Sequence, residues 1–149
     1  HSQVVESIER IVRAECDAGR APKPPTLKVL NETIALNNDA IAVEHVRRAH
    51  AEHFGDANLY DMPRLNGSED FPFFGNAKAA GFGGEDIPYV YWFIGSTPAE
   101  RWANTPGTNV SQKMRHLEMP HSPYYFPGND VTLRTGIEAM VVGAMAYLT

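Results

Sequence analysis

Apolar residues recur at helical spacing in two stretches of the first third of the chain. The first stretch has charged residues on its opposite face, and its apolar positions are Val4, Val5, Ile8, Ile11 and Val12. This pattern predicts an amphipathic helix over residues 2–17, with Gly19 in its C-cap region. The second helix is expected after Asn38 or Asp39, either of which can accept from its free N–H groups, and Gly55 ends it. Its apolar positions are Ile41, Val43, Val46, Ala49 and Phe54.

Two stretches have the character of strands. Polar and apolar residues alternate over most of residues 26–30, which predicts a short strand. Residues 89–94 form a near-continuous run of β-branched and aromatic side chains between Pro88 and Gly95. Such a run predicts a strand that is buried on both faces.

The remaining elements follow from capping residues and composition. Ser68 is a good N-cap, and Pro72 fits the first turn of a helix. Residues 96–119 are polar and rich in Gly, Pro and Asn, which predicts a long loop. Residues 132–148 predict a largely buried terminal helix. Helices outnumber strands, yet the strand at 89–94 looks central, so we expect an α/β fold.

The composition is that of a soluble globular protein, with 43% hydrophobic and 21% charged residues in a chain of 149. The net charge of -5 does not favour binding to nucleic acid, which is itself negatively charged. The sequence also has no run of Lys and Arg residues of the kind that binds a membrane surface. No segment approaches the roughly 18 apolar residues of a membrane span. Cys16 is the only cysteine, which excludes an internal disulfide. We therefore expect a cytoplasmic chain with neither a nucleic-acid nor a membrane partner.

The N-terminus gives no sign of a targeting segment. Residues 1–13 are amphipathic and charged where a signal peptide would have its apolar region. The chain begins with His1 rather than Met, so we expect that it starts inside a larger protein or that its start was trimmed.

A stretch of the second helix with three histidines, His45, His50 and His53, is a candidate for metal binding. His50 and His53 are three residues apart, but zinc helices of the protease kind need HExxH or HxxEH, and His-Ala-Glu-His matches neither. We therefore interpret this stretch as a solvated helix face. A stand-alone zinc hydrolase that uses His50, His53 and His121 is a disfavoured alternative. Chemistry at Cys16 is not expected, because its neighbours Glu15 and Asp17 are acidic and a reactive thiolate needs positively charged surroundings.

Three later segments, taken together and in order, indicate a protein family more specifically than any one of them does alone. We call residues 67–71 the GSEDF segment, residues 87–95 the aromatic segment and residues 121–125 the HSPYY segment. Their order, with the acidic turn and the Ala/Gly-rich helix that follow, resembles the end of the aminoacylase/carboxypeptidase family of metallohydrolases. The resemblance is to its amidohydrolase branch, which includes hippurate hydrolases, N-acyl-amino-acid deacylases and auxin-conjugate hydrolases. It covers essentially the whole chain.

The resemblance implies the architecture of a zinc-peptidase-like catalytic domain with three layers and a mixed sheet. An α+β lid domain is inserted into that domain in the family, and it often mediates dimerisation. By this template, residues 1–31 correspond to the last helix and strand of the lid. Residues 32–149 correspond to the C-terminal half of the catalytic domain. A homodimer through the lid is then a possible assembly.

The resemblance also implies the chemistry. His121 matches the last metal ligand of the family, whose two metal ions are usually zinc and sometimes manganese or cobalt. Ser68, Glu69 and Asp70 match a segment close to the active site, in the vicinity of the substrate pocket. The general base of the family belongs to an upstream motif that this chain lacks, so no catalytic residue is assigned here.

The function that follows is hydrolysis of the amide bond of small N-acyl amino acids or peptides by metal-activated water. Since His121 is one ligand without the others, the chain alone is expected to be inactive. The alternative is a non-catalytic α/β domain that binds partners or dimerises, with His121 as an ordinary loop histidine and no metal.

Overall fold

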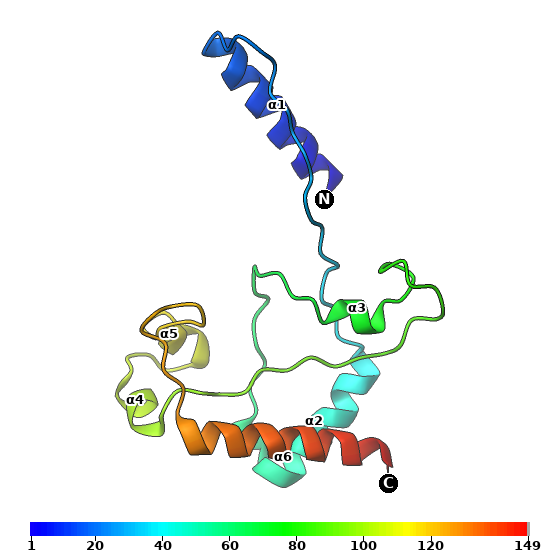
Figure 1. Cartoon of the computed structure of the whole chain (residues 1–149). Coiled ribbons are helices and arrows are strands. Elements are labelled where there is room, and N and C mark those ends of the chain that lie inside the picture. Colours follow the sequence, from blue (N-terminus) through cyan, green and yellow to red (C-terminus); the bar gives the residue numbers. More distant parts are fainter. Residues whose placement is uncertain (149) are drawn as a thin grey trace. The chain divides into compact units, whose positions relative to one another are not determined.

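In a computed structural model, residues 1–148 are described and 47% of the chain is helical. The chain divides into two compact units, His1–Thr33 and the part from Ile34 onward. The helices are α1 (Ser2–Ala18), α2 (Ala40–Phe54), η1 (Asp56–Asn58), α3 (Pro72–Gly75), α4 (Ala99–Asn104), α5 (Val110–Met114) and α6 (Asn129–Leu148), as labelled in Figure 1.

The first unit is one amphipathic helix and the extended chain that follows it. Helix α1 begins at Ser2 as predicted and ends at Ala18, one residue beyond the predicted end, and Gly19 is its C-cap residue as expected. No residue of α1 is buried, and Val4, Ile8 and Ile11 are all more than half exposed. After α1 the chain turns back and runs alongside the helix (Figure 1). The His1 imidazole lies 3.0 Å from the Glu32 carboxylate at the far end of this return.

Helix α2 begins and ends at the predicted residues. The Asp39 carboxylate accepts a 2.8 Å hydrogen bond from the Ala42 N–H, which satisfies one of the free donors of the first turn. Gly55 follows the last turn with a φ of 84°, in the left-handed region that favours glycine.

Helix α6 is present as predicted, but the expectation that it is largely buried is wrong. It packs against α2, and its buried positions include Ala139 and Gly143. Other apolar side chains of α6 remain mostly in solvent, among them Leu133 (67% exposed) and Met140 (61%). A helix that is apolar all round needs neighbours on several sides, and in the described part of the chain α2 and the aromatic segment cover only one.

The predicted α/β fold is wrong, because the described residues contain no β-strand and no sheet. Residues 26–30 are extended but unpaired, and so are residues 89–94 (Figure 1). A strand needs a repeating ladder of backbone hydrogen bonds with a neighbour. In its place, the side-chain amide of Asn38 donates to the Tyr91 carbonyl and accepts from the Tyr91 N–H, both at 2.8 Å. Residues 89–94 are also not buried on both faces, since Phe93 is 56% exposed.

Two local predictions also need correction. Helix α3 starts at Pro72, which occupies the first turn as expected, but the N-cap position belongs to Phe71 and not to Ser68. Residues 96–119 are not a continuous loop, since they contain α4 and α5. Asn109 caps α5 by accepting from the Gln112 N–H, a signal that the loop prediction overlooked.

One stretch of α6, Asp130–Leu148, is long and apolar enough to cross a bilayer when judged by length and a mean hydropathy of 1.2. The expectation that no segment approaches a membrane span therefore does not hold on those two criteria. Core helices of soluble proteins also satisfy both criteria.

Candidate functional site

The side chain of Glu69 joins the GSEDF segment to the aromatic segment. Its Oε2 atom accepts a 2.9 Å hydrogen bond from the Tyr91 hydroxyl. Its Oε1 atom accepts from the backbone N–H groups of Asp70 (3.0 Å) and Phe71 (3.2 Å). The carboxylate therefore ties Tyr91 to the residues just before α3, and its main role here is positional.

These contacts change the acid strength of both partners. The hydrogen bond from Tyr91, and after it the one from the Phe71 N–H, lowers the pKa of Glu69 below its usual value. Partial burial, followed by the bond to Glu69, raises the pKa of Tyr91. At neutral pH the pair therefore consists of an ionised carboxylate and a neutral phenol, which is the combination that the hydrogen bond requires.

Tyr91 is also held through its backbone. The Asn38 amide forms the two hydrogen bonds to its N–H and carbonyl described above. One residue along, the Asp39 N–H donates 3.0 Å to the Tyr89 carbonyl. The Asn-Asp pair that precedes α2 thus fixes the start of the aromatic segment beside that helix.

A second side-chain contact joins Ser96, the residue directly after the aromatic segment, to the HSPYY segment. The hydroxyl groups of Ser96 and Tyr125 lie 2.5 Å apart. The Ser96 carbonyl also accepts a 2.7 Å bond from the Gly128 N–H at the start of α6. Ser96 thus connects to residues on both sides of Phe126 and Pro127. The aromatic segment is linked to the GSEDF segment through Tyr91 and to the HSPYY segment through the adjoining Ser96.

His121 occupies an unusual backbone conformation at the start of the HSPYY segment. Its φ is 76°, and Arg20 is the one other non-glycine residue with a positive φ among those described. Histidine visits this left-handed region more often than most residues, yet the conformation carries strain and is kept only where the surroundings impose it. Bonds from Ser122 N–H to the Met119 carbonyl and from Tyr125 N–H to the Ser122 carbonyl, both 3.1 Å, impose a tight turn here. The residue itself is exposed.

The donor set for a metal ion is incomplete in the described part of the chain. A zinc site needs at least three protein donors close together. No group of three or more His, Cys, Asp or Glu side chains with that proximity occurs among residues 1–148. The residues present therefore do not make up a metal site, and His121 is a single imidazole donor. The other segment residues named from the sequence, Ser68 and Asp70, are exposed.

The histidines of α2 face α6, so the interpretation as a solvated face is wrong for two of them. His50 is 7% exposed, and its Nε2 atom lies 3.0 Å from the Ala139 carbonyl oxygen. His45 is half-buried and contacts the Ala146 carbonyl in the same way. Because a carbonyl can only accept, each of these Nε2 atoms carries a proton. That proton removes the Nε2 atoms of His45 and His50 as metal donors.

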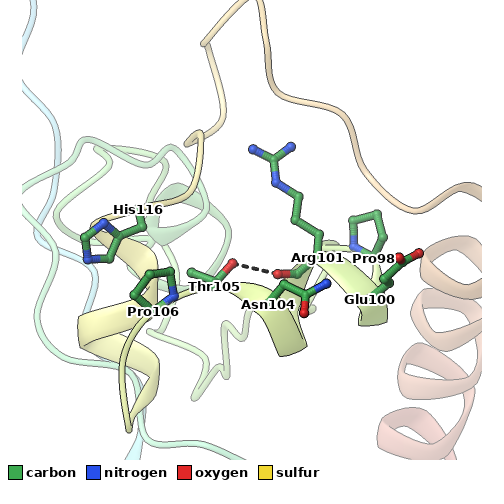
Figure 2. A pocket seen from close by; sticks show the side chains of 7 residues that line it. All are labelled: Pro98, Glu100, Arg101, Asn104, Thr105, Pro106 and His116. Atoms are coloured by element: carbon green, nitrogen blue, oxygen red, sulfur yellow. Dashed lines mark hydrogen bonds between the residues drawn. The ribbon is translucent and has the colours of Figure 1, made fainter.

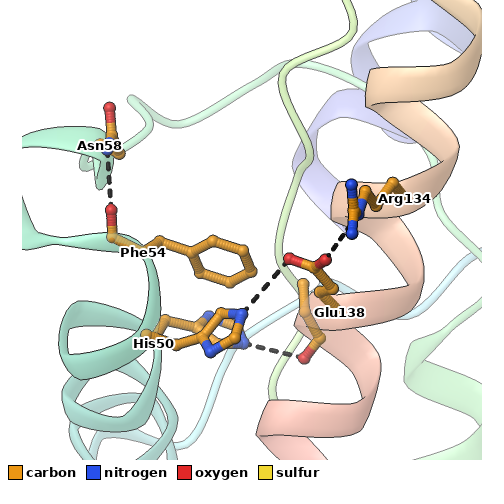
Figure 3. A network of polar contacts seen from close by, with 7 residues as sticks. His50, Phe54, Asn58, Arg134 and Glu138 are labelled. Atoms are coloured by element: carbon orange, nitrogen blue, oxygen red, sulfur yellow. Dashed lines mark hydrogen bonds and ion pairs between the residues drawn. The ribbon is translucent and has the colours of Figure 1, made fainter.

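His53 is the exposed member of this histidine set. It lies 3.3 Å from the Glu138 carboxylate, which also accepts from Arg134 at 3.0 Å, as Figure 3 shows for the Glu138 and Arg134 side chains. The bond from His53, ahead of the one from Arg134, lowers the pKa of Glu138. The alternative zinc site at His50, His53 and His121 finds no support, since no group of three or more His, Cys, Asp or Glu side chains that could hold a metal ion occurs among residues 1–148.

A surface pocket of about 480 Å³ lies between α4 and the chain after α5 (Figure 2). It is lined by Pro98, Glu100, Arg101, Asn104, Thr105, Pro106 and His116. None of the residues named from the sequence lines it. Arg101 is paired with Glu118, and the Thr105 hydroxyl donates to the Arg101 carbonyl. Its polar groups are thus partly engaged, and we assign it no function.

Sequence reasoning missed both contacts that link the motif segments. Tyr91 belongs to a run that predicts only a strand, Ser96 begins the stretch that predicts a loop, and Tyr125 is one of two adjacent tyrosines. Nothing in their spacing indicates which hydroxyl meets which partner.

A scan against models of known protein families finds none that matches this chain.

Proposed function

We propose that this chain is the C-terminal part of a metal-dependent amidohydrolase that cleaves the amide bond of small N-acyl amino acids or peptides. The observation that carries the proposal is the linkage of the three motif segments. Glu69 bonds Tyr91 of the aromatic segment, and Ser96, the residue directly after that segment, bonds Tyr125, so segments that resemble one family in sequence are also linked to one another in order.

His121 is the residue through which the chain contributes to a metal site. Its exposed position and its left-handed backbone within a hydrogen-bonded turn are consistent with a side chain kept for binding rather than for packing. In this proposal, the remaining metal donors and the general base belong to the rest of the enzyme of which this chain is the C-terminal part. The metal is zinc by preference, with manganese or cobalt as alternatives, because an imidazole donor suits each of them.

Glu69, with its neighbours Ser68 and Asp70, lies near the substrate pocket in this proposal. Both carboxylate oxygens of Glu69 are engaged by Tyr91 and by backbone N–H groups, so its role is to hold the segment in place. We assign no catalytic residue within the chain, and the chain alone is inactive.

The same proposal includes a cytoplasmic location and a homodimer through the first unit. The exposed stripe of α1 supports the second point, because Val4, Ile8 and Ile11 lie on one face and are 51–62% exposed. The proposal includes no nucleic-acid partner and no membrane partner. The ligand is the substrate, a small N-acyl amino acid or peptide.

The test is hydrolysis of a panel of N-acyl amino acids by the polypeptide that the whole gene encodes. We expect release of the free amino acid, its loss on treatment with a chelator and its recovery on addition of zinc. No hydrolysis of any amide in the panel, with metal supplied, would argue for the alternative of a non-catalytic domain.

A further inference from the structure

Asn66 and Gly67 form the one Asn-Gly pair in the sequence, and they lie directly before Ser68. Both residues are exposed. Neither forms a hydrogen bond with any other described residue, whether through the backbone or through the Asn66 amide. A Cβ atom built on Gly67 would meet nothing within 4 Å. The backbone of this pair is therefore free to change its conformation.

Several other asparagines are held by contacts that restrict their side chains. Asn38 uses both amide atoms on Tyr91. Asn76 donates to the Tyr89 hydroxyl, Asn58 donates to the Phe54 carbonyl, and Asn109 accepts from the Gln112 N–H. Each of these four is also followed by a residue bulkier than glycine. Asn66 differs from them in sequence and in structure at once.

We propose that Asn66 is a site of spontaneous deamidation, with the backbone nitrogen of Gly67 as the nucleophile. That nitrogen loses its proton to solvent and attacks Cγ of Asn66, so that a C–N bond forms. The bond from Cγ to Nδ2 breaks and ammonia leaves, which yields a cyclic imide. Water then opens the imide at either carbonyl to give aspartate or isoaspartate. One water is consumed and one ammonia is released, and no oxidant or reductant takes part.

Glycine at position 67 makes the attack possible because it has no Cβ to block the approach or to limit the backbone angles. The folded chain imposes no further barrier, since no hydrogen bond of the pair has to break first. The reaction in the folded chain is therefore as fast as in a free peptide of the same sequence.

The modification adds one negative charge just before the GSEDF segment. Position 66 lies three residues before Glu69, which is about 10 Å along an extended chain. This separation is close to the Debye length at physiological ionic strength, so the new charge is largely screened from Glu69. The Glu69–Tyr91 hydrogen bond is retained, and the modified chain keeps its fold.

The test is incubation of the chain in mildly alkaline buffer made with heavy-oxygen water, followed by peptide mapping with mass spectrometry. The matched control is Gly67→Ala, which introduces a Cβ into open space at a position without a positive φ. A synthetic peptide of residues 62–71 gives the rate without the fold.

We expect heavy oxygen to enter first at position 66, as a mixture of aspartate and isoaspartate, at the rate of the synthetic peptide. Gly67→Ala slows this conversion several-fold and leaves the thermal unfolding of the fresh protein unchanged. Conversion of Asn38 or Asn76 as fast as Asn66 would overturn the proposal. So would a rate in the folded chain far below that of the peptide, or a Gly67→Ala variant that reacts as fast as the native chain.

Discussion

The hydroxyl of Tyr91 donates a 2.9 Å hydrogen bond to the carboxylate of Glu69, two residues that are 22 positions apart in sequence. Removing the donor leaves the carboxylate with its two backbone partners only. We therefore expect Tyr91→Phe to raise the pKa of Glu69 toward its usual value, measurable by NMR titration of the carboxyl carbon. Tyr89→Phe is the control, because the Tyr89 hydroxyl makes no contact with Glu69. An unchanged Glu69 pKa in Tyr91→Phe would show that the bond is not formed in solution.

Acid should weaken the fold through two carboxylates. Glu69 and Glu138 both have a pKa below the usual value in the folded chain, chiefly because of Tyr91 and His53 respectively. A depressed folded-state pKa contributes stability that is fully present above the unfolded pKa of about 4.3 and is lost as the pH falls through the folded-state pKa. Urea unfolding between neutral and acidic pH measures this loss. In the double variant Glu69→Gln, Glu138→Gln the acid-side slope should be smaller, and an equal slope would contradict the assignment.

His50 stabilises the contact between α2 and α6. Its buried imidazole donates to the Ala139 carbonyl and lies edge-on against Trp92, with ring centroids 5.3 Å apart. His50→Ala leaves that carbonyl without this donor and should cost about 1–3 kcal/mol. His53→Ala is the matched control on the same helix, and because its pair with Glu138 is exposed the loss should be smaller. Equal losses in urea unfolding would contradict this difference in burial.

Gly75 is required for close packing of α3 on the aromatic segment. A Cβ at this position would collide with the Tyr89 ring and would lie 2.9 Å from the Ile87 carbonyl oxygen. We expect Gly75→Ala to destabilise the chain by roughly 1–3 kcal/mol, as overpacking usually does. Gly136→Ala is the control, since its Cβ would meet the Ile94 side chain at 3.4 Å, at the limit of ordinary contact. Thermal unfolding of the two variants distinguishes them, and equal midpoints would contradict the close approach at Gly75.

The exposed stripe of α1 should mediate self-association of the first unit. A charge on this stripe would remain buried and unpaired in a dimer, so Ile8→Asp should shift the chain toward monomer in sedimentation equilibrium. Gln3→Asp adds the same charge away from Ile8 on the helix surface and should leave association unchanged. A native chain that is monomeric at all concentrations would exclude a dimer through this stripe.

The helices could be predicted from the sequence where the pattern is local. The apolar stripe of α1 and the caps Asp39 and Gly55 of α2 depend on residues within a few positions, and each of these predictions is confirmed. The strand at 89–94 could not be judged locally, because a strand exists only through its partner. The Asn38 amide bonds Tyr91 where a neighbouring strand would pair, and no local pattern indicates this.

In the candidate site, too, the features that depend on local sequence could be predicted and the contacts between distant residues could not. Sequence order identified the three segments and His121, but the contacts that link them are pairs of side chains such as Ser96 and Tyr125, 29 residues apart. Likewise, the polar pattern of His45 and His50 suggested solvent, although their ring N–H groups bond carbonyl oxygens of α6. A buried polar side chain with a backbone partner looks like a surface residue until that partner is known.

The role of His121 can be measured through the metal content of the polypeptide that the whole gene encodes, purified in parallel with its His121→Ala variant and with a His116→Ala control. If His121 is a metal ligand, the His121 variant should lose bound zinc at equilibrium dialysis while its thermal unfolding without metal matches that of the native protein. The His116 variant should keep its zinc. Equal zinc content in the native and His121→Ala proteins would contradict the assignment, and with it the metallohydrolase proposal for this chain.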